Sequence, residues 1–103
     1  MKKILTLFVV FISISRFSSG AIISKETFDS MLKKRIVVFE GLRCYVNMDF
    51  WNALDVTQKK KFCIDVSDTH KYYKQEALYK FYSLKDESII AKKVSSSGYE
   101  ILK

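Results

Sequence analysis

The first twenty residues have the layout of a secretory signal peptide, and this decides which part of the chain has to fold. A short cationic start, Met1-Lys2-Lys3, is followed by an apolar run from Ile4 to Ile14 and then by small residues, which is the order found in cleaved export signals. The apolar run is about half of the ~20 residues that cross a bilayer core, and Arg16 closes it. We therefore expect residues 1–20 to be removed and residues 21–103 to fold as a single domain.

Small residues also indicate where the signal peptide is cut. Signal peptidase requires them one and three positions before the cleaved bond. Ser18 and Gly20 meet this requirement for a cut before Ala21, and Ser19 with Ala21 meets it for a cut one residue later. The competing interpretation is a buried N-terminal helix of a cytosolic protein. We expect export, to the periplasm or out of the cell, from a bacterial host.

Removal of the signal peptide changes the charge balance of the protein. Lys2, Lys3 and Arg16 would leave with it, so the net charge of +7 falls to about +4. This mild basicity favours contact with anionic surfaces such as envelope polymers. Recognition of base edges and bidentate binding of phosphate both favour arginine. Residues 21–103 contain only two arginines, Arg35 and Arg43. Nucleic acid is therefore disfavoured as a partner.

The chain has two cysteines, Cys44 and Cys63, both in the part expected to fold. A domain of about 80 residues is marginally stable on its core alone, and small exported domains often add a covalent staple. In an oxidising compartment an isolated cysteine pair predicts a disulfide, which would contribute roughly 3 kcal/mol by the chain-entropy model. The alternative is two buried free thiols, and the choice depends on whether the Cα atoms lie within about 7 Å.

The first half of the folded part predicts a helix and a hairpin. Ser24 can cap a helix over residues 25–34, in which apolar residues share one side. Residues 35–39 are β-branched and aromatic, and residues 42–46 alternate between apolar and polar, so both segments predict strands. Gly41 lies between them and favours a turn.

The second half predicts helices followed by strands. Asn47 can cap a short helix over residues 48–54. Asp55 and Gln58 have the spacing of a capping box, which begins a longer helix from Val56 to about Tyr73. Three further strands are expected over residues 77–84, 89–94 and 99–102. The predicted fold is α+β, with a small antiparallel sheet, made of the hairpin and a C-terminal meander, packed against one longer helix.

Part of this pattern resembles very short exported bacterial proteins of unknown function. The resemblance covers about half the chain, from Phe50 to the end. It is carried by Phe50-Trp51-Asn52 with Leu54, by the lysine-rich stretch Lys59 to Phe62, and by Ile90-Ala91-Lys92. It implies export and brings no activity or site residue with it.

The residues that usually perform catalysis are sparse in this sequence. His70 is the single histidine, and Cys63 lies seven residues before it, about 10 Å away along a common helix. Asp65 and Asp68 share a helix face that His70 does not complete, and soft-metal ligand spacing is missing. We therefore expect no catalytic residue, no metal site and no cofactor, and we expect His70 at the surface or near a helix end.

Aromatic and cationic residues predict a binding surface near the end of the long helix. Tyr72, Tyr73 and Lys74 end the helix, and Tyr79 and Lys80 begin the strand that follows. Tyrosine beside lysine is a common composition for contact surfaces. The sequence predicts a non-catalytic binding or inhibitory module whose partner is another protein or an anionic envelope polymer. The alternatives are an envelope-associated structural or stress protein and, less favoured, a secreted effector or small hydrolase.

Overall fold

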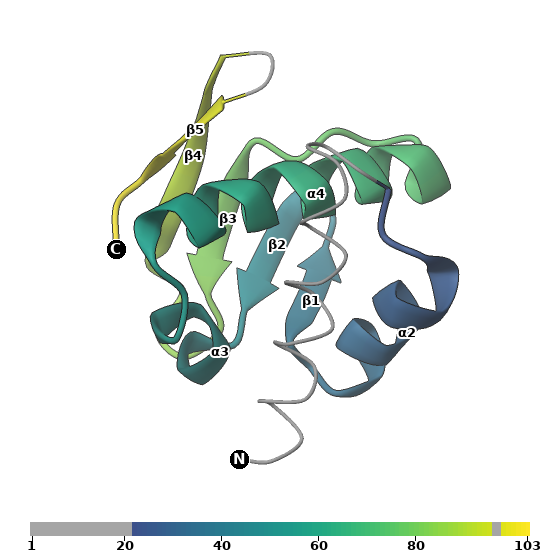
Figure 1. Ribbon diagram of the computed structural model, residues 1–103, viewed down its shortest axis with the longest axis horizontal. Helices are drawn as coiled ribbons and strands as arrows, with labels where there is room; N and C mark the ends of the chain where they lie inside the picture. The colour runs from purple at the N-terminus through teal and green to yellow at the C-terminus, as the bar shows by residue number, and fades with distance from the viewer. Residues whose placement is uncertain (1–21, 96–97) are drawn as a thin grey trace.

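A computed structural model describes residues 22–95 and 98–103 of the chain (Figure 1). The predicted signal peptide (residues 1–20) and Ala21, the residue that follows the expected cut, lie outside the described residues. The helices and strands follow in the order α2 (Lys25–Lys33), β1 (Val37–Glu40), β2 (Arg43–Val46), α3 (Met48–Asn52), α4 (Val56–Lys74), β3 (Lys80–Ser83), β4 (Ile89–Ser95) and β5 (Gly98–Ile101).

The five strands form one sheet in the order of the chain, β1-β2-β3-β4-β5. Three neighbouring pairs are antiparallel, and the predicted α+β class, with the longer helix α4 packed on a mostly antiparallel sheet, is confirmed. The pairing of β2 with β3 is parallel, which the sequence did not predict. Its cause is the helical connection: α3 and α4 carry the chain back to the end of the sheet where β2 began, and a crossover of this kind joins parallel strands.

Side-chain caps begin α2, α3 and α4, as the sequence predicted. The Ser24 hydroxyl accepts a hydrogen bond at the start of α2, and the Asn47 side chain accepts one at 3.0 Å from the Phe50 N–H at the start of α3. At the start of α4, Asp55 accepts from the Gln58 N–H at 2.8 Å, and Gln58 accepts in return from the Asp55 N–H at 2.9 Å. Both halves of the capping box are thus formed.

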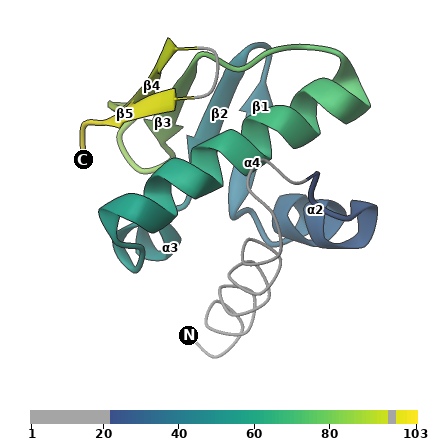
Figure 2. The ribbon, with the colours of Figure 1, turned by 45° about the horizontal axis from the view of Figure 1, so that its top comes forward.

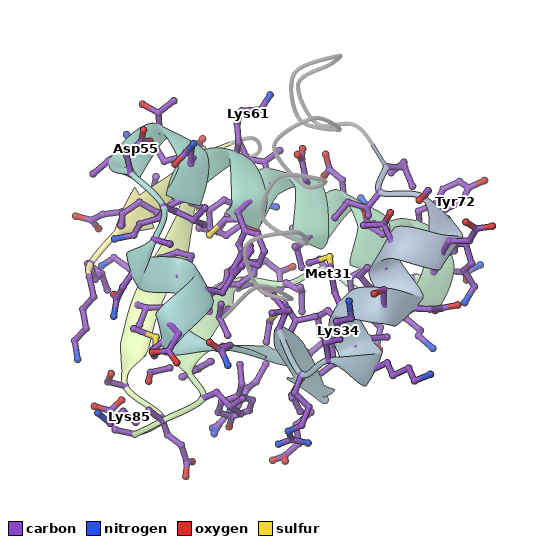
Figure 3. The ribbon with its side chains drawn as sticks, turned by 60° about the horizontal axis from the view of Figure 1, so that its bottom comes forward. Met31, Lys34, Asp55, Lys61, Tyr72 and Lys85 are labelled. Atoms are coloured by element: carbon purple, nitrogen blue, oxygen red, sulfur yellow. The ribbon has the colours of Figure 1, made fainter. Side chains whose placement is uncertain are left out.

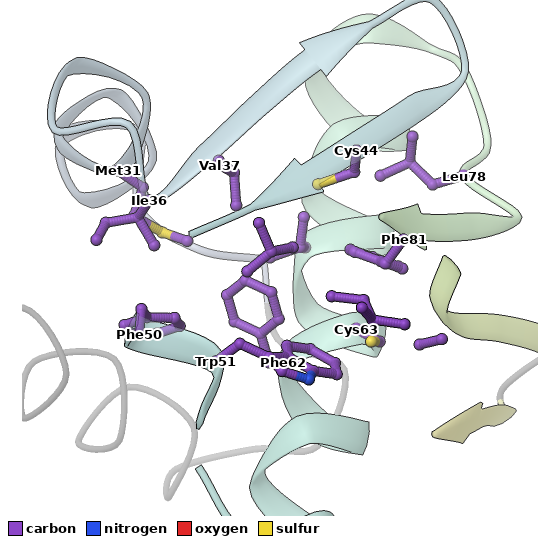
Figure 4. Close-up of a cluster of buried hydrophobic side chains, with 14 of the residues drawn as sticks. Met31, Ile36, Val37, Cys44, Phe50, Trp51, Phe62, Cys63, Leu78 and Phe81 are labelled. Atoms are coloured by element: carbon purple, nitrogen blue, oxygen red, sulfur yellow. The ribbon is translucent and has the colours of Figure 1, made fainter. Parts of the chain in front are cut away.

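The core lies between α4 and the sheet (Figure 4). Phe62 of α4 is its centre, because its ring lies 5.3 Å from that of Phe50, 6.0 Å from that of Trp51 and 6.3 Å from that of Phe81. All four side chains are completely buried. Rings from α3 and from β3 therefore pack on the same residue of α4, which ties both elements to the helix.

His70 lies near the C-terminal end of α4, as one of the two expected placements had it, but it is buried, so the expectation of a surface position was wrong. It is 2% exposed, and its ring lies 4.6 Å from the ring of Phe39 on β1. Its Nδ1 is 2.9 Å from the carbonyl oxygen of Glu76. Because a carbonyl only accepts, Nδ1 carries the ring proton. The edge strand β1 and helix α2 extend the core beneath the second half of α4, and this covers the histidine.

The three helices of the described residues lie on the same side of the sheet. Figure 2 shows α2, α3 and α4 on one side of the strands, and in Figure 1 α4 crosses in front of them. On the opposite side, none of the elements formed by residues 22–95 and 98–103 covers the sheet. Within the same residues, no helix has both the length and the apolar character that crossing a membrane requires.

Candidate functional site

The uncovered side of the sheet carries an ordered set of side chains. Cys44 and Phe81 point toward α4 and are buried in the core. Since side chains alternate along a strand, their sequence neighbours on β2 and β3 point the other way. The register between the strands then assigns one set of residues to this side, which we call the outer face: Val38, Glu40, Arg43, Tyr45, Lys80, Tyr82, Ile89, Lys92 and Glu100.

One row of the outer face is charged and crosses all five strands. In register order it consists of Glu40, Arg43, Lys80, Lys92 and Glu100, each paired with the next. The three central residues are cations on neighbouring strands, which lie about 4.8 Å apart. Like charges in directly opposed positions destabilise a sheet. The ion pair between Lys92 and Glu100, at 3.5 Å, relieves this at one end of the row, and Glu40 lies opposite Arg43 at the other.

The second row of the outer face is aromatic and aliphatic. It consists of Val38, Tyr45, Tyr82 and Ile89, paired in that order across β1 to β4. The rings of Tyr45 and Tyr82 lie 5.5 Å apart with an interplanar angle of 35°. Tyr45 is only 7% exposed, whereas Tyr82 is half-buried and Ile89 is exposed. The surface that a partner would meet in this row is therefore Tyr82 with Ile89.

Arg43 connects the two rows. Its guanidinium carbon lies 5.3 Å from the centre of the Tyr82 ring, within cation–π range. Its Nη1 donates to the Tyr45 hydroxyl at 3.5 Å. This hydrogen bond, more than any other contact, raises the pKa of Arg43 above its ordinary value. The cation is thus held over an aromatic pair, and a guanidinium has further N–H donors for a ligand.

The five residues predicted to form a binding surface do not lie together. Lys80 is the middle cation of the outer face. Tyr79 precedes it, is 56% exposed and has the Lys93 ammonium 5.6 Å from its ring centre. Tyr72 and Lys74 are exposed at the C-terminal end of α4, away from the sheet. Figure 3 shows Tyr72 projecting outward at that end of the helix.

Tyr73 is half-buried and packs against the elements around it. Its ring lies 5.8 Å from that of Phe28 in α2, and its hydroxyl donates to the carbonyl oxygen of Ile23 at 3.4 Å. The Lys25 ammonium lies 5.5 Å from the centre of the same ring. Tyr73 therefore joins α4 to α2 and to the segment before it.

Sequence reasoning missed Arg43, Tyr45, Tyr82 and Lys92 as candidate site residues. The alternation within residues 42–46 and 77–84 was recognised, and it does place Arg43 with Tyr45 and Lys80 with Tyr82 on shared faces. What the alternation lacks is any sign of which face the helices leave open. The available clue to the open face was the number of predicted helices, because all of them are needed to cover one side of a small sheet.

Cys44 and Cys63 are not joined in the structure. Both are free thiols with no exposed surface, on β2 and α4 respectively. Figure 4 shows them in the same core with their sulfur atoms apart. Burial raises the pKa of both thiols well above the ordinary value, which makes them poor nucleophiles. The disulfide in the exported protein stays a prediction.

The outer face offers cations, hydroxyls and apolar surface, which are groups that can bind a partner. Among residues 22–95 and 98–103, no three side chains of histidine, cysteine, aspartate or glutamate come together as metal ligands. Comparison of the chain with protein-family models, with curated proteins and with solved structures found no match.

Proposed function

We propose that the protein is a small exported binding module that acts without catalysis and contacts another protein through its outer face. The observation that carries this proposal is the cluster of Arg43, Tyr45 and Tyr82 on the side of the sheet that no described element covers. Arginine and tyrosine are among the residues most enriched at the energetic centres of protein interfaces.

The cluster is also prepared for binding before a partner arrives. Arg43 is held by the Tyr45 hydroxyl and by the Tyr82 ring, and both rings are packed against each other. Ordering a long side chain at an interface costs about 0.5–1.5 kcal/mol, and here much of that ordering exists in the free protein. A held guanidinium therefore favours recognition over a purely structural role.

The predicted signal peptide supports an exported location for this module. The cationic start, the apolar run and the small residues before Ala21 favour secretion. A protein partner of the envelope or of the surroundings fits this location, and so does an inhibitory mode of action in which occupying a surface is sufficient.

Capture of partners by outer-face variants tests the proposal. The tagged full chain would be expressed in its host and recovered with bound proteins from the exported fraction. We expect Arg43→Ala and Tyr82→Ala to lose the partners that the wild type retains. Tyr72→Ala is the matched control, because Tyr72 is 66% exposed and lies at the far end of α4; it should keep them. Unfolding curves of each variant would show that the fold is intact.

Two results would reject the proposal. Retention of every partner by both outer-face variants would show that this face is not the contact surface. Loss of partners in Tyr72→Ala alone would move the contact to the end of α4. The competing candidate, an envelope-associated structural or stress protein held by charge, predicts instead that Tyr82→Ala changes nothing while added salt releases the protein.

A further inference from the structure

We propose that the outer face binds a short, extended, acidic segment of the partner protein, with its carboxylates on the cation row of Arg43, Lys80 and Lys92. This inference rests on the proposed function and names the chemistry of its partner. It follows from three properties of the charged row: the excess of positive charge at its centre, its length, and the carboxylates at its two ends.

Lys80 is the point of greatest positive charge on this face. Its two cross-strand neighbours are Arg43 and Lys92, both cations. Lys92 has a carboxylate partner in Glu100 at 3.5 Å, and Arg43 has Glu40 as its neighbour on the far side. Lys80 has cations on either side in its row. Directly opposed like charges cost stability, and an incoming anion at this position would relieve the repulsion from both directions.

The length of the row fits a peptide in extended conformation. Three cations on neighbouring strands span roughly 10 Å, at about 4.8 Å per step. Residues i and i+2 of an extended peptide point to the same side and lie about 6.6–6.8 Å apart. Two acidic side chains at this spacing fall within the row, and the flexible stems of Lys80 and Lys92 can take up the difference. The second row then lies alongside, offering Tyr82 and Ile89 to apolar side chains of the same segment.

The ends of the row exclude a long polyanion. Glu40 on β1 and Glu100 on β5 stand at either end of the three cations. A continuous anionic polymer or an anionic membrane that covered the row would extend over these carboxylates and be repelled by them. Stacked bases are also disfavoured, since Arg43 lies over the Tyr82 ring and Tyr45 is buried, whereas single-strand nucleic acid binding needs free ring faces.

Peptide titration of the isotope-labelled protein, followed by NMR, tests this inference directly. The probe is a capped peptide, Thr-Glu-Val-Glu-Val-Thr, and its matched control replaces both glutamates by glutamine. We expect the glutamate peptide to shift the amide signals of β2, β3 and β4, and the glutamine peptide to leave them unchanged. Lys80→Ala should weaken binding roughly three- to tenfold, the effect of one charge-assisted contact, whereas Lys60→Ala, on an exposed part of α4, should not.

The other outcomes overturn the inference. Equal shifts with the glutamine peptide would show that the carboxylates are not recognised. Shifts confined to the lysines of α4 would place the anion elsewhere. Binding of long polyglutamate or of anionic phosphatidylglycerol vesicles, without binding of the short peptide, would assign the row to a polyanion. If the peptide fails while Arg43→Ala still loses the captured partners, the proposed function stands and only the acidic segment is rejected.

Discussion

The hydroxyl of Tyr99 on β5 donates a hydrogen bond of 2.9 Å to the carbonyl oxygen of Leu78, just before β3. Both residues are buried, and the Tyr99 ring stands edge-on to Phe81 at 5.5 Å. Burial, as the largest cause, raises the pKa of Tyr99 from 10.0 to about 12. The folded state therefore favours the neutral phenol. The stabilising contribution is fully present below pH 10 and is lost as the pH rises from 10 toward 12.

Alkaline unfolding measures this contribution. A shift of this size corresponds to roughly 2–3 kcal/mol, and we expect the free energy of unfolding to fall by about that amount across the window. Tyr99→Phe should remove the fall and cost about 1–2 kcal/mol at neutral pH, because the Leu78 carbonyl loses its donor. Urea titrations at several pH values check both effects. Tyr79→Phe, at an exposed position, is the control; an unchanged alkaline fall in Tyr99→Phe would contradict the assignment.

Two positions of left-handed backbone predict stability changes of opposite sign. Gln75, at the end of α4, has a φ of 59°, and Gly41, in the turn between β1 and β2, has a φ of 62°. Glycine adopts this conformation without steric cost, and other residues pay up to about 1 kcal/mol. We expect Gln75→Gly to stabilise the protein by about 0.5–1 kcal/mol and Gly41→Ala to destabilise it by a similar amount. Thermal unfolding of the two variants, compared with the wild type, should shift in opposite directions; a shift in the same direction would refute the conformational explanation.

Much of the fold could be predicted from local patterns. The capping box of Asp55 and Gln58 fixed the start of α4, and alternation around Gly41 fixed the hairpin of β1 and β2. These features depend on residues close together in the sequence. The parallel pairing of β2 with β3 depends instead on where α4 returns the chain, and no residue within either strand encodes it.

Burial of single residues and the open side of the sheet were harder to predict for a related reason. His70 lies on the polar-rich end of a helix, and it is buried because α2 and β1 pack there. Arg43 and Tyr45 share a face in any strand, but only the placement of all helices on the other side makes that face a candidate site. Both properties come from the tertiary arrangement and become visible once the elements are assembled.

The oxidation state of Cys44 and Cys63 can be decided by alkylation. Because both thiols are buried and have raised pKa values, we expect iodoacetamide to leave them unmodified in the folded protein and to modify both after denaturation. If the predicted disulfide forms on export, the denatured but unreduced protein would take up no label. Mass spectrometry of the exported protein distinguishes the two states. The same spectrum gives the N-terminus, and an intact Met1 would contradict the cut before Ala21.

From the charged row we predict that Lys80 lowers the free energy of unfolding of the free protein while it favours binding of an anion. Lys80 has Arg43 and Lys92 as its cross-strand neighbours, so Lys80→Glu would convert two repulsions into two attractions. We expect this variant to be more stable than the wild type by about 0.4–1 kcal/mol, with the gain shrinking as salt is added, and to bind no acidic peptide. Lys92→Glu is the matched variant, since it makes the same charge change on the same face but breaks the ion pair with Glu100. It leaves two carboxylates opposed and should be less stable than Lys80→Glu. Urea unfolding at low and high salt separates the two, and a loss of stability in Lys80→Glu would show that the cations of the row do not repel one another enough to attract an anion.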